Sequence, residues 1–173
     1  MFGDLALQGL PHPEGLASTS CLPEAGAMDE TKIVSASTVI AAPAETVFEE
    51  IADPARQIAW DGNENLAESA AGQRVHAVGD VFVTVTTSGN ARHNHVVEFE
   101  EGRRIAWRPS AEGQAPFGHL WRWELRPTDD GGTEATHTYD WTELTDESRV
   151  ERARSTTSER LQASLDRLAA LFG

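Results

Sequence analysis

The strongest constraint on the fold is a series of short alternating segments in the middle of the chain. Apolar and polar residues alternate within each segment, and the segments are separated by turns that contain glycine. A period of two puts the apolar side chains of a strand on one face, and tight turns between such strands are typical of antiparallel hairpins. The pattern therefore predicts a sheet whose apolar face another element must cover. The expected strands are residues 64–70, 80–88, 92–100, 104–110, 117–126 and 133–142.

A further strand and two short helices are expected before this series. Residues 32–41 are rich in β-branched side chains and alternate loosely, which favours a strand. Pro43 suits the first turn of a helix, where its missing N–H costs nothing, and apolar residues follow it at helical spacing. Asp53-Pro54 resembles a cap and a first helical residue, so it predicts a second short helix through Trp60.

The C-terminal segment predicts a single long helix of about seven turns, at 3.6 residues a turn. Thr145 is its expected cap, and the acidic residues that follow suit the positive end of the helix dipole. Because Ala153, Thr157 and Ser164 are small, the inner face is expected to leave a cavity against the sheet. That face, read at steps of three and four residues, consists of Val150, Ala153, Thr157, Leu161, Ser164, Leu165, Leu168 and Phe172.

Residue chemistry predicts the register of two hairpins, because oppositely charged and apolar residues pair best across strands. A loop at residues 101–103 sets Glu100 opposite Arg104, Phe99 opposite Ile105 and Val97 opposite Trp107. In the hairpin that turns at residues 128–132, the inner pairs are Leu125–Ala135, Trp123–His137, Trp121–Tyr139 and His119–Trp141. The outer pairs of that hairpin are Arg126–Glu134 and Arg122–Thr138.

This order of elements, with its motifs, resembles the START/polyketide cyclase-dehydrase superfamily (SRPBCC), whose helix-grip fold is shared with plant pollen allergens. The resemblance covers most of residues 31–172. It is strongest in STVIAAPAETVFEEIADPARQIAWDG (37–62), VVEFEEGRRIAWRP (96–109) and WRWELRPTDDGGTEATHTYDW (121–141). It implies an α+β fold in which a curved seven-stranded antiparallel sheet wraps around a long C-terminal helix, with a hydrophobic pocket between them. It implies no single reaction, since members include lipid carriers, aromatase/cyclases, hormone receptors and chaperone-ATPase activators.

Large aromatic residues on the predicted inner faces are the main candidates for the pocket wall. Each could simply fill the core, but the small residues of the facing helix favour a lined cavity. Because buried indole N–H and phenol groups need partners, such a wall suits a flat, partly polar ligand. The predicted ligand-binding residues are Trp107, Trp121, Trp123, His137, Tyr139, Trp141, Val97, Leu161 and Leu165.

Histidines are the main candidates for metal binding or acid–base chemistry. His93 and His95 share a strand face, but no cysteine accompanies them in the domain, so neither a metal nor another cofactor is expected. An enzyme would use His95 or His137 as the general base and Tyr139 as a proton donor or oxyanion stabiliser. No nucleophile, base and acid come together in the pattern.

Charge and composition argue against several classes of binding partner and indicate a cellular location. The formal net charge is −14 with no basic run, which argues against binding to nucleic acid or to an anionic membrane. No apolar stretch approaches the roughly 20 residues of a membrane-spanning helix, so membrane insertion is not expected. The single cysteine, Cys21, cannot form an internal disulfide, which indicates a reducing, cytoplasmic location.

The chain divides near residue 28. Residues 1–27 contain three prolines, four glycines and no basic residue, without any helical or strand period. They lack the positive region and apolar run of a secretory signal. They are predicted to form a flexible tail, or an upstream extension if translation begins at Met28, before a domain at 28–173.

Three functions remain open. The leading hypothesis is a binding or carrier protein for an apolar, aromatic or polycyclic small molecule, and the alternative is a cyclase/dehydratase enzyme that uses the same pocket. The third is a chaperone-type interaction module, which would need a large exposed apolar patch. The predicted outer rows argue against it, because they carry Glu98, Arg108, Arg122, Glu124, Arg126, Thr136 and Thr138.

Overall fold

A computed structural model describes residues 30–173, and residues 31–173 form one α+β unit. Its seven strands make a single antiparallel sheet in the order β1-β7-β6-β5-β4-β3-β2, as the helix-grip fold requires. The predicted tail at 1–27 lies outside the described residues. The strands are β1 (Ile33–Ile40), β2 (Leu66–Ser69), β3 (Val81–Thr86), β4 (Ala91–Glu100), β5 (Arg104–Ser110), β6 (Leu120–Pro127) and β7 (Thr133–Asp140).

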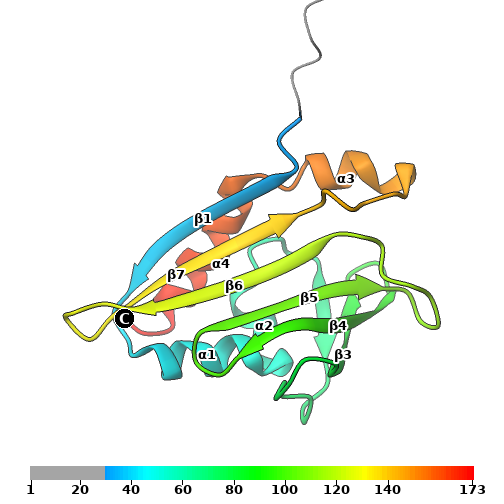
Figure 1. Cartoon of the computed structure of the whole chain (residues 1–173). Coiled ribbons are helices and arrows are strands. Elements are labelled where there is room, and N and C mark those ends of the chain that lie inside the picture. Colours follow the sequence, from blue (N-terminus) through cyan, green and yellow to red (C-terminus); the bar gives the residue numbers. More distant parts are fainter. Residues whose placement is uncertain (1–29) are drawn as a thin grey trace, which may run out of the picture. The chain divides into compact units, whose positions relative to one another are not determined.

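Helices cover one face of this sheet. Figure 1 shows α4 behind β1 and β7, with α3 near the end of β7 and α1 near the opposite end, where β1 ends. None of the helices in the described part of the chain is long and apolar enough to cross a membrane. The helices are α1 (Ala44–Ala52), η1 (Pro54–Arg56), α2 (Gln57–Trp60), η2 (Glu147–Arg149), α3 (Val150–Arg154) and α4 (Ser158–Ala170).

The two predicted short helices after β1 are confirmed. α1 buries Val47, Phe48 and Ile51 on one face, as their three- and four-residue spacing requires. Pro43 stands one place earlier than predicted, at the cap rather than in the first turn. The Asp53 carboxylate accepts a hydrogen bond from the Ala55 N–H at 3.1 Å, so it caps the short helix that follows.

The prediction of one long C-terminal helix was wrong, because the helix is interrupted at residues 155–157. The hydroxyl groups of Ser155 and Thr156 both donate to the Arg152 carbonyl oxygen, at 2.7 and 3.3 Å. Such bonds from Ser and Thr side chains compete with the helical hydrogen-bond ladder, and a run of them favours a break. The N-terminal cap is Asp146, which accepts from the Ser148 N–H, and not Thr145.

Two of the small residues on the C-terminal helix do not border a cavity, contrary to prediction. Thr157 lies in the interruption and is exposed. Ser164 is buried, and its Oγ accepts a hydrogen bond from the Gly62 N–H at 2.9 Å. A Cβ atom on Gly62 would lie 2.4 Å from the Ser164 nitrogen, so both small residues allow α4 and the end of α2 to approach closely.

The predicted register is confirmed in the hairpin of β6 and β7, from Arg126–Glu134 to Trp121–Tyr139. His119 precedes the first residue of β6, so its predicted pairing with Trp141 does not form part of the ladder. In the hairpin of β4 and β5 the first two predicted pairs are present. A β-bulge then inserts Val97, so that Val96 and not Val97 lies opposite Trp107.

A continuous apolar core fills the end of the unit nearest α1. Leu165 and Leu168 of α4 pack there with Phe48 of α1 and with Phe82 and Val96 of the sheet. All five side chains are at most 2% exposed. This core fixes the position of α4 against the sheet and leaves the other end of the inner face to the shorter α3.

Candidate functional site

A cavity of about 380 Å³ lies at the end of the inner face where β7 ends and α3 begins. Its walls come from the inner faces of β3 to β7, from α2 and from the segment around the helix interruption. Both fully buried and exposed side chains line it, so it reaches from the core to the surface. This volume falls within the range of small-molecule sites, which is roughly 300–1,000 Å³.

Aromatic rings form one wall of the cavity. The Trp123 and His137 rings stack with centroids 3.9 Å apart and an angle of 12° between their planes. The next cross-strand pair, Trp121 and Tyr139, has its centroids 4.4 Å apart. Trp60 meets Trp123 edge-on at 5.1 Å. The pairing of β6 with β7 thus holds two neighbouring ring pairs side by side as a rigid apolar surface.

Among the described residues, Arg149 Nε and three further buried polar atoms of the cavity lining have no hydrogen-bond partner. The three are Gln57 Nε2, Trp123 Nε1 and His137 Nδ1. Their side chains are at most 4% exposed, and all three residues line the cavity. A buried polar group without a partner costs about 1–3 kcal/mol, and most such groups in folded proteins are satisfied. Their concentration here distinguishes the cavity from an ordinary apolar void.

Burial alters the ionisation of the groups that could act as acids or bases. It lowers the pKa of His137 to about 3. It also lowers the pKa of His119 to about 4, and Arg149 and Arg152 add to that effect. The pKa of Tyr139 is raised to about 12, mainly by burial. Near neutral pH both imidazoles are therefore uncharged and the phenol keeps its proton.

The outer part of the cavity is cationic. Arg92 of β4, Arg149 of η2, Arg152 of α3 and Arg160 of α4 all line it. The guanidinium carbons of Arg92 and Arg149 lie 5.5 and 3.4 Å from the centroid of the Phe117 ring, so two of these cations contact the same aromatic ring.

The predicted site residues divide into three groups. Trp107, Trp121, Trp123, His137 and Tyr139 lie in the cavity wall. Trp141, Leu161 and Leu165 are buried in the core and do not line the cavity, so that part of the prediction was wrong. Val97 and His95 do not line it either, and their exclusion has a different cause.

The bulge at Val97 reverses which residues of β4 face inward. Counting by twos from Phe99 assigns Val97 and His95 to the inner face, but the inserted residue shifts the count by one. Val97 is consequently 37% exposed, and Asn94 and Val96 are buried instead. His95 Nε2 lies 2.9 Å from the Ser110 hydroxyl and cannot act as a base in the cavity.

The same reversal explains two cavity residues that sequence reasoning missed, Arg92 and Asn94. The adjacent valines Val96 and Val97 interrupt the alternation, and that doublet was the available signal. Arg149 and Arg152 were missed because a continuous helix predicts no inward position for them. Within residues 30–173 no group of three or more potential metal ligands gathers at any point.

Comparisons with known proteins agree with this architecture. The sequence model of the family described as polyketide cyclase / dehydrase and lipid transport matches residues 31–173. No curated protein matches the chain. Among solved structures, protein MLL2253 from Mesorhizobium loti is 18% identical with a TM-score of 0.59, and the match covers 80% of this chain and 95% of that one.

Two further solved structures show how widely the fold is shared. The Aha1 dimer from Colwellia psychrerythraea is 14% identical with a TM-score of 0.57, over 81% of this chain and 95% of that chain. DynU16, a protein of the dynemicin biosynthetic locus, is 20% identical with a TM-score of 0.57, over 82% of this chain and 47% of that one. At these identities the likeness shows the fold alone.

Proposed function

Because this chain belongs to the family of polyketide cyclases, dehydrases and lipid-transport proteins, we propose that it binds an apolar small molecule with an aromatic or polycyclic skeleton in its cavity. The proposed role is that of a binding or carrier protein. The observation that carries it is the aromatic wall of a cavity of about 380 Å³, built from Trp107, Trp121, Trp123 and Tyr139. Offset and edge-on contacts with such rings favour a flat ligand.

The unpartnered polar atoms support a ligand that also carries oxygen. Gln57 Nε2 and Trp123 Nε1 are donors, and His137 Nδ1 can donate or accept according to its tautomer. A carbonyl or hydroxyl group on the ligand would satisfy them, whereas a plain acyl chain would leave them unpaired. A partly oxygenated ring system therefore suits this wall best.

The alternative is an enzyme of the cyclase/dehydratase kind in the same cavity, with His137 as the base and Tyr139 as the proton donor. The family description includes such enzymes. The ionisation of the wall favours a carrier, however, because burial lowers the pKa of His137 to about 3. A general base is most effective when its pKa is near the working pH. Tyr139, which keeps its proton, remains suited to donate a hydrogen bond.

The third hypothesis, a chaperone-type interaction module, has less support in the outer face of the sheet. Charged residues there are engaged with one another: Arg122 Nε donates to Glu98 at 2.9 Å, and Arg126 forms an ion pair with Glu134. A surface covered by such ion pairs presents polar groups where an apolar docking patch would be needed.

Native mass spectrometry of the purified protein, followed by denaturation and identification of any released molecule, tests the proposal most directly. A complementary assay uses N-phenyl-1-naphthylamine, an uncharged aromatic probe that fluoresces in apolar surroundings. We expect it to bind, and Trp121→Leu to weaken its binding at least tenfold. Trp141→Leu is the matched control, since Trp141 is buried outside the cavity. Equal effects of the two substitutions would contradict the proposed site.

A further inference from the structure

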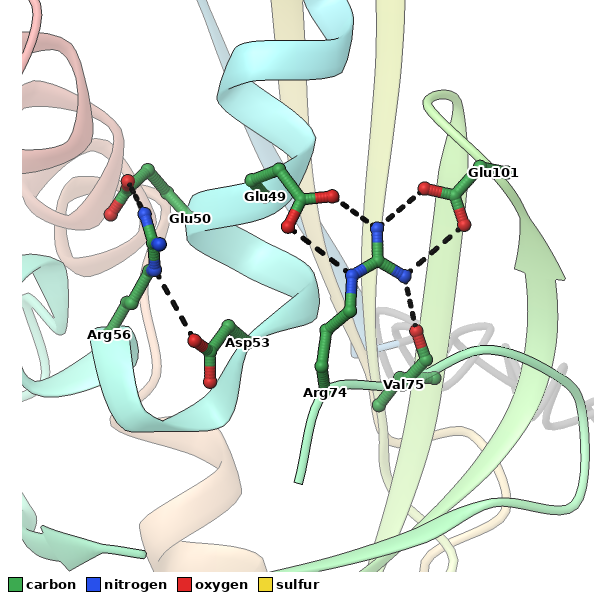
Figure 2. Close-up of polar contacts among 7 residues, drawn as sticks. All are labelled: Glu49, Glu50, Asp53, Arg56, Arg74, Val75 and Glu101. Atoms are coloured by element: carbon green, nitrogen blue, oxygen red, sulfur yellow. Dashed lines mark hydrogen bonds and ion pairs between the residues drawn. The ribbon is translucent and has the colours of Figure 1, made fainter. Parts of the chain in front are cut away.

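Most arginines in the described part of this protein have a carboxylate partner. The chain has 28 acidic residues against 14 basic ones, so partners are plentiful. Figure 2 shows two examples beside α1: Arg74 lies between Glu49 and Glu101, and Arg56 lies between Glu50 and Asp53. Across the described residues, every arginine forms an ion pair except Arg92, Arg152 and Arg160.

All three exceptions line the cavity. They come from three separate elements, β4, α3 and α4, so their convergence is a product of the tertiary structure. In the orientation of the Asn65 amide that satisfies its neighbours, Arg152 Nη2 donates to the amide oxygen at 2.9 Å. An amide oxygen orients that guanidinium without neutralising its charge.

A fourth cavity arginine, Arg149, is only partly compensated. Its Nε lies 3.3 Å from a carboxylate oxygen of Asp146, but the geometry is not that of a hydrogen bond and Nε keeps no such partner. Among the described residues, the one carboxylate that lines the cavity is Asp61, which accepts hydrogen bonds from the N–H groups of Asn63 and Asn65. The Asp61 carboxylate is therefore hydrogen-bonded within its own loop and forms no ion pair with the cavity arginines.

Mutual repulsion makes this grouping unfavourable by itself. Burial, together with the charges of Arg149 and Arg152, lowers the pKa of Arg92. Like charges that are partly removed from water raise the free energy of the folded protein unless an opposite charge joins them. In a protein with a large excess of carboxylates, arginines at a cavity rim that have no carboxylate partner, or only a partly compensating one, are suited to bind an anion from outside.

We propose that the ligand of this cavity is an organic anion, an aromatic acid whose acidic group lies among Arg92, Arg149 and Arg152. Its ring system extends inward along Trp121 and Trp123. The inference rests on the proposed function, since it names the class of ligand for the same cavity. Guanidinium groups bind planar anionic groups through paired hydrogen bonds, and they retain their charge where a lysine would lose it. Arg160, exposed at the rim, adds to the positive potential that attracts the anion.

Two probes with the same ring system test the charge requirement. N-phenyl-1-naphthylamine is uncharged, and 8-anilinonaphthalene-1-sulfonate is the same skeleton with one sulfonate. We expect the wild-type protein to bind the sulfonate at least tenfold more tightly than the uncharged probe at low salt. Added salt should reduce this preference, because the interaction is between charges near the surface.

Charge-neutralising variants locate the interaction. Arg152→Gln, at an exposed position, and Arg92→Gln should each weaken sulfonate binding about tenfold and change binding of the uncharged probe less than twofold. Arg126→Gln makes the same change of charge on the outer face and should affect neither probe. Because the uncharged probe reports an intact cavity, it also shows whether each variant is folded.

The possible outcomes separate this inference from the proposed function. Binding of the uncharged probe without a preference for the sulfonate would overturn the anion inference and leave the apolar-ligand proposal standing. Equal losses of sulfonate binding in Arg152→Gln and Arg126→Gln would also overturn it, by assigning the effect to net charge. Failure of both probes to bind at millimolar concentration would overturn both proposals.

Discussion

The inner face of the sheet changes character along its own strands. At the end nearest α1, which we call the closed end, it carries Phe82, Val96 and Ala135, all buried in the core. Two residues further along the same strands, at the open end, these positions are Thr84, Asn94 and His137, all of which line the cavity. The alternation continues without interruption between the two ends, yet an apolar side chain is replaced by a polar one on each strand.

The elements that cover the two ends differ in the same way. Leu165 and Leu168 of α4 fill the closed end, whereas the short α3 presents Ala153 to the open end. The interruption at residues 155–157 separates the two coverings. The comparison indicates that the same strands are packed with apolar side chains at one end, which supplies stability, and carry polar side chains that line a cavity at the other.

Shortening a buried side chain at the closed end should have the largest effect on the free energy of unfolding. Leu165 is fully buried, so Leu165→Ala removes apolar contacts and leaves a cavity that costs about 2–5 kcal/mol of the free energy of unfolding. Urea unfolding measures this change. Leu171→Ala, at a side chain that is 45% exposed, should change stability by less than about 0.5 kcal/mol. If Leu165→Ala also lost less than about 0.5 kcal/mol, α4 would not be holding the sheet in place.

Enlarging an alanine should distinguish the two ends. Ala135→Leu overfills the closed end and should cost about 1–3 kcal/mol of the free energy of unfolding. Ala153→Leu projects into the cavity, so it should cost less than about 1 kcal/mol and abolish binding of the uncharged naphthylamine probe. Thermal or urea unfolding with a probe titration measures both. Equal destabilisation by the two substitutions would mean that the open end is packed.

The buried histidine of the open end should make stability depend on pH. The folded-state pKa of His137 is about 3, below the value of about 6.5 in an unfolded chain. The unfolded state therefore binds the proton first, and stability present above pH 6.5 is lost as the pH falls toward 3. Between pH 7.5 and 5.5 this loss is roughly 1.4 kcal/mol for one such histidine.

Unfolding curves at the two pH values test this expectation. His137→Gln should lose roughly 1.4 kcal/mol less than the wild type between pH 7.5 and 5.5, whatever its stability at neutral pH. His76→Gln, which removes an imidazole at an exposed position, serves as the control. An unchanged dependence in His137→Gln would show that this imidazole is accessible to water.

The stacked rings should give the smallest effect, a coupling between two substitutions. Trp123 and His137 lie 3.9 Å apart, so the double mutant Trp123→Ala/His137→Gln should deviate from additivity by about 0.5–1.5 kcal/mol in unfolding free energy. His95→Gln combined with Trp123→Ala should be additive, because His95 does not line the cavity. Additivity in the first pair would mean that the Trp123 and His137 rings are not in contact, and would contradict the proposed aromatic wall.

Pairing chemistry between neighbouring strands could be read from the chain itself. The ladder from Trp121–Tyr139 to Arg126–Glu134 was predictable because a slip of one residue would set a Trp row against a polar row. That register placed two of the ring pairs of the site correctly. The order of the elements and the family resemblance likewise predicted the sheet and its covering helix, which depend on periodicity over many residues.

Only the tertiary structure decided which side chains enter the cavity. A single inserted residue at Val97 exchanges His95 for Asn94 and Arg92, since a period of two has no tolerance for a shift of one. The interruption before α4 places Arg152 at the rim. Several arginines pair with a carboxylate three residues away, but Arg74, Arg108 and Arg167 find theirs 25, 35 and 103 residues away in the sequence, and such distant contacts are not encoded in any local pattern.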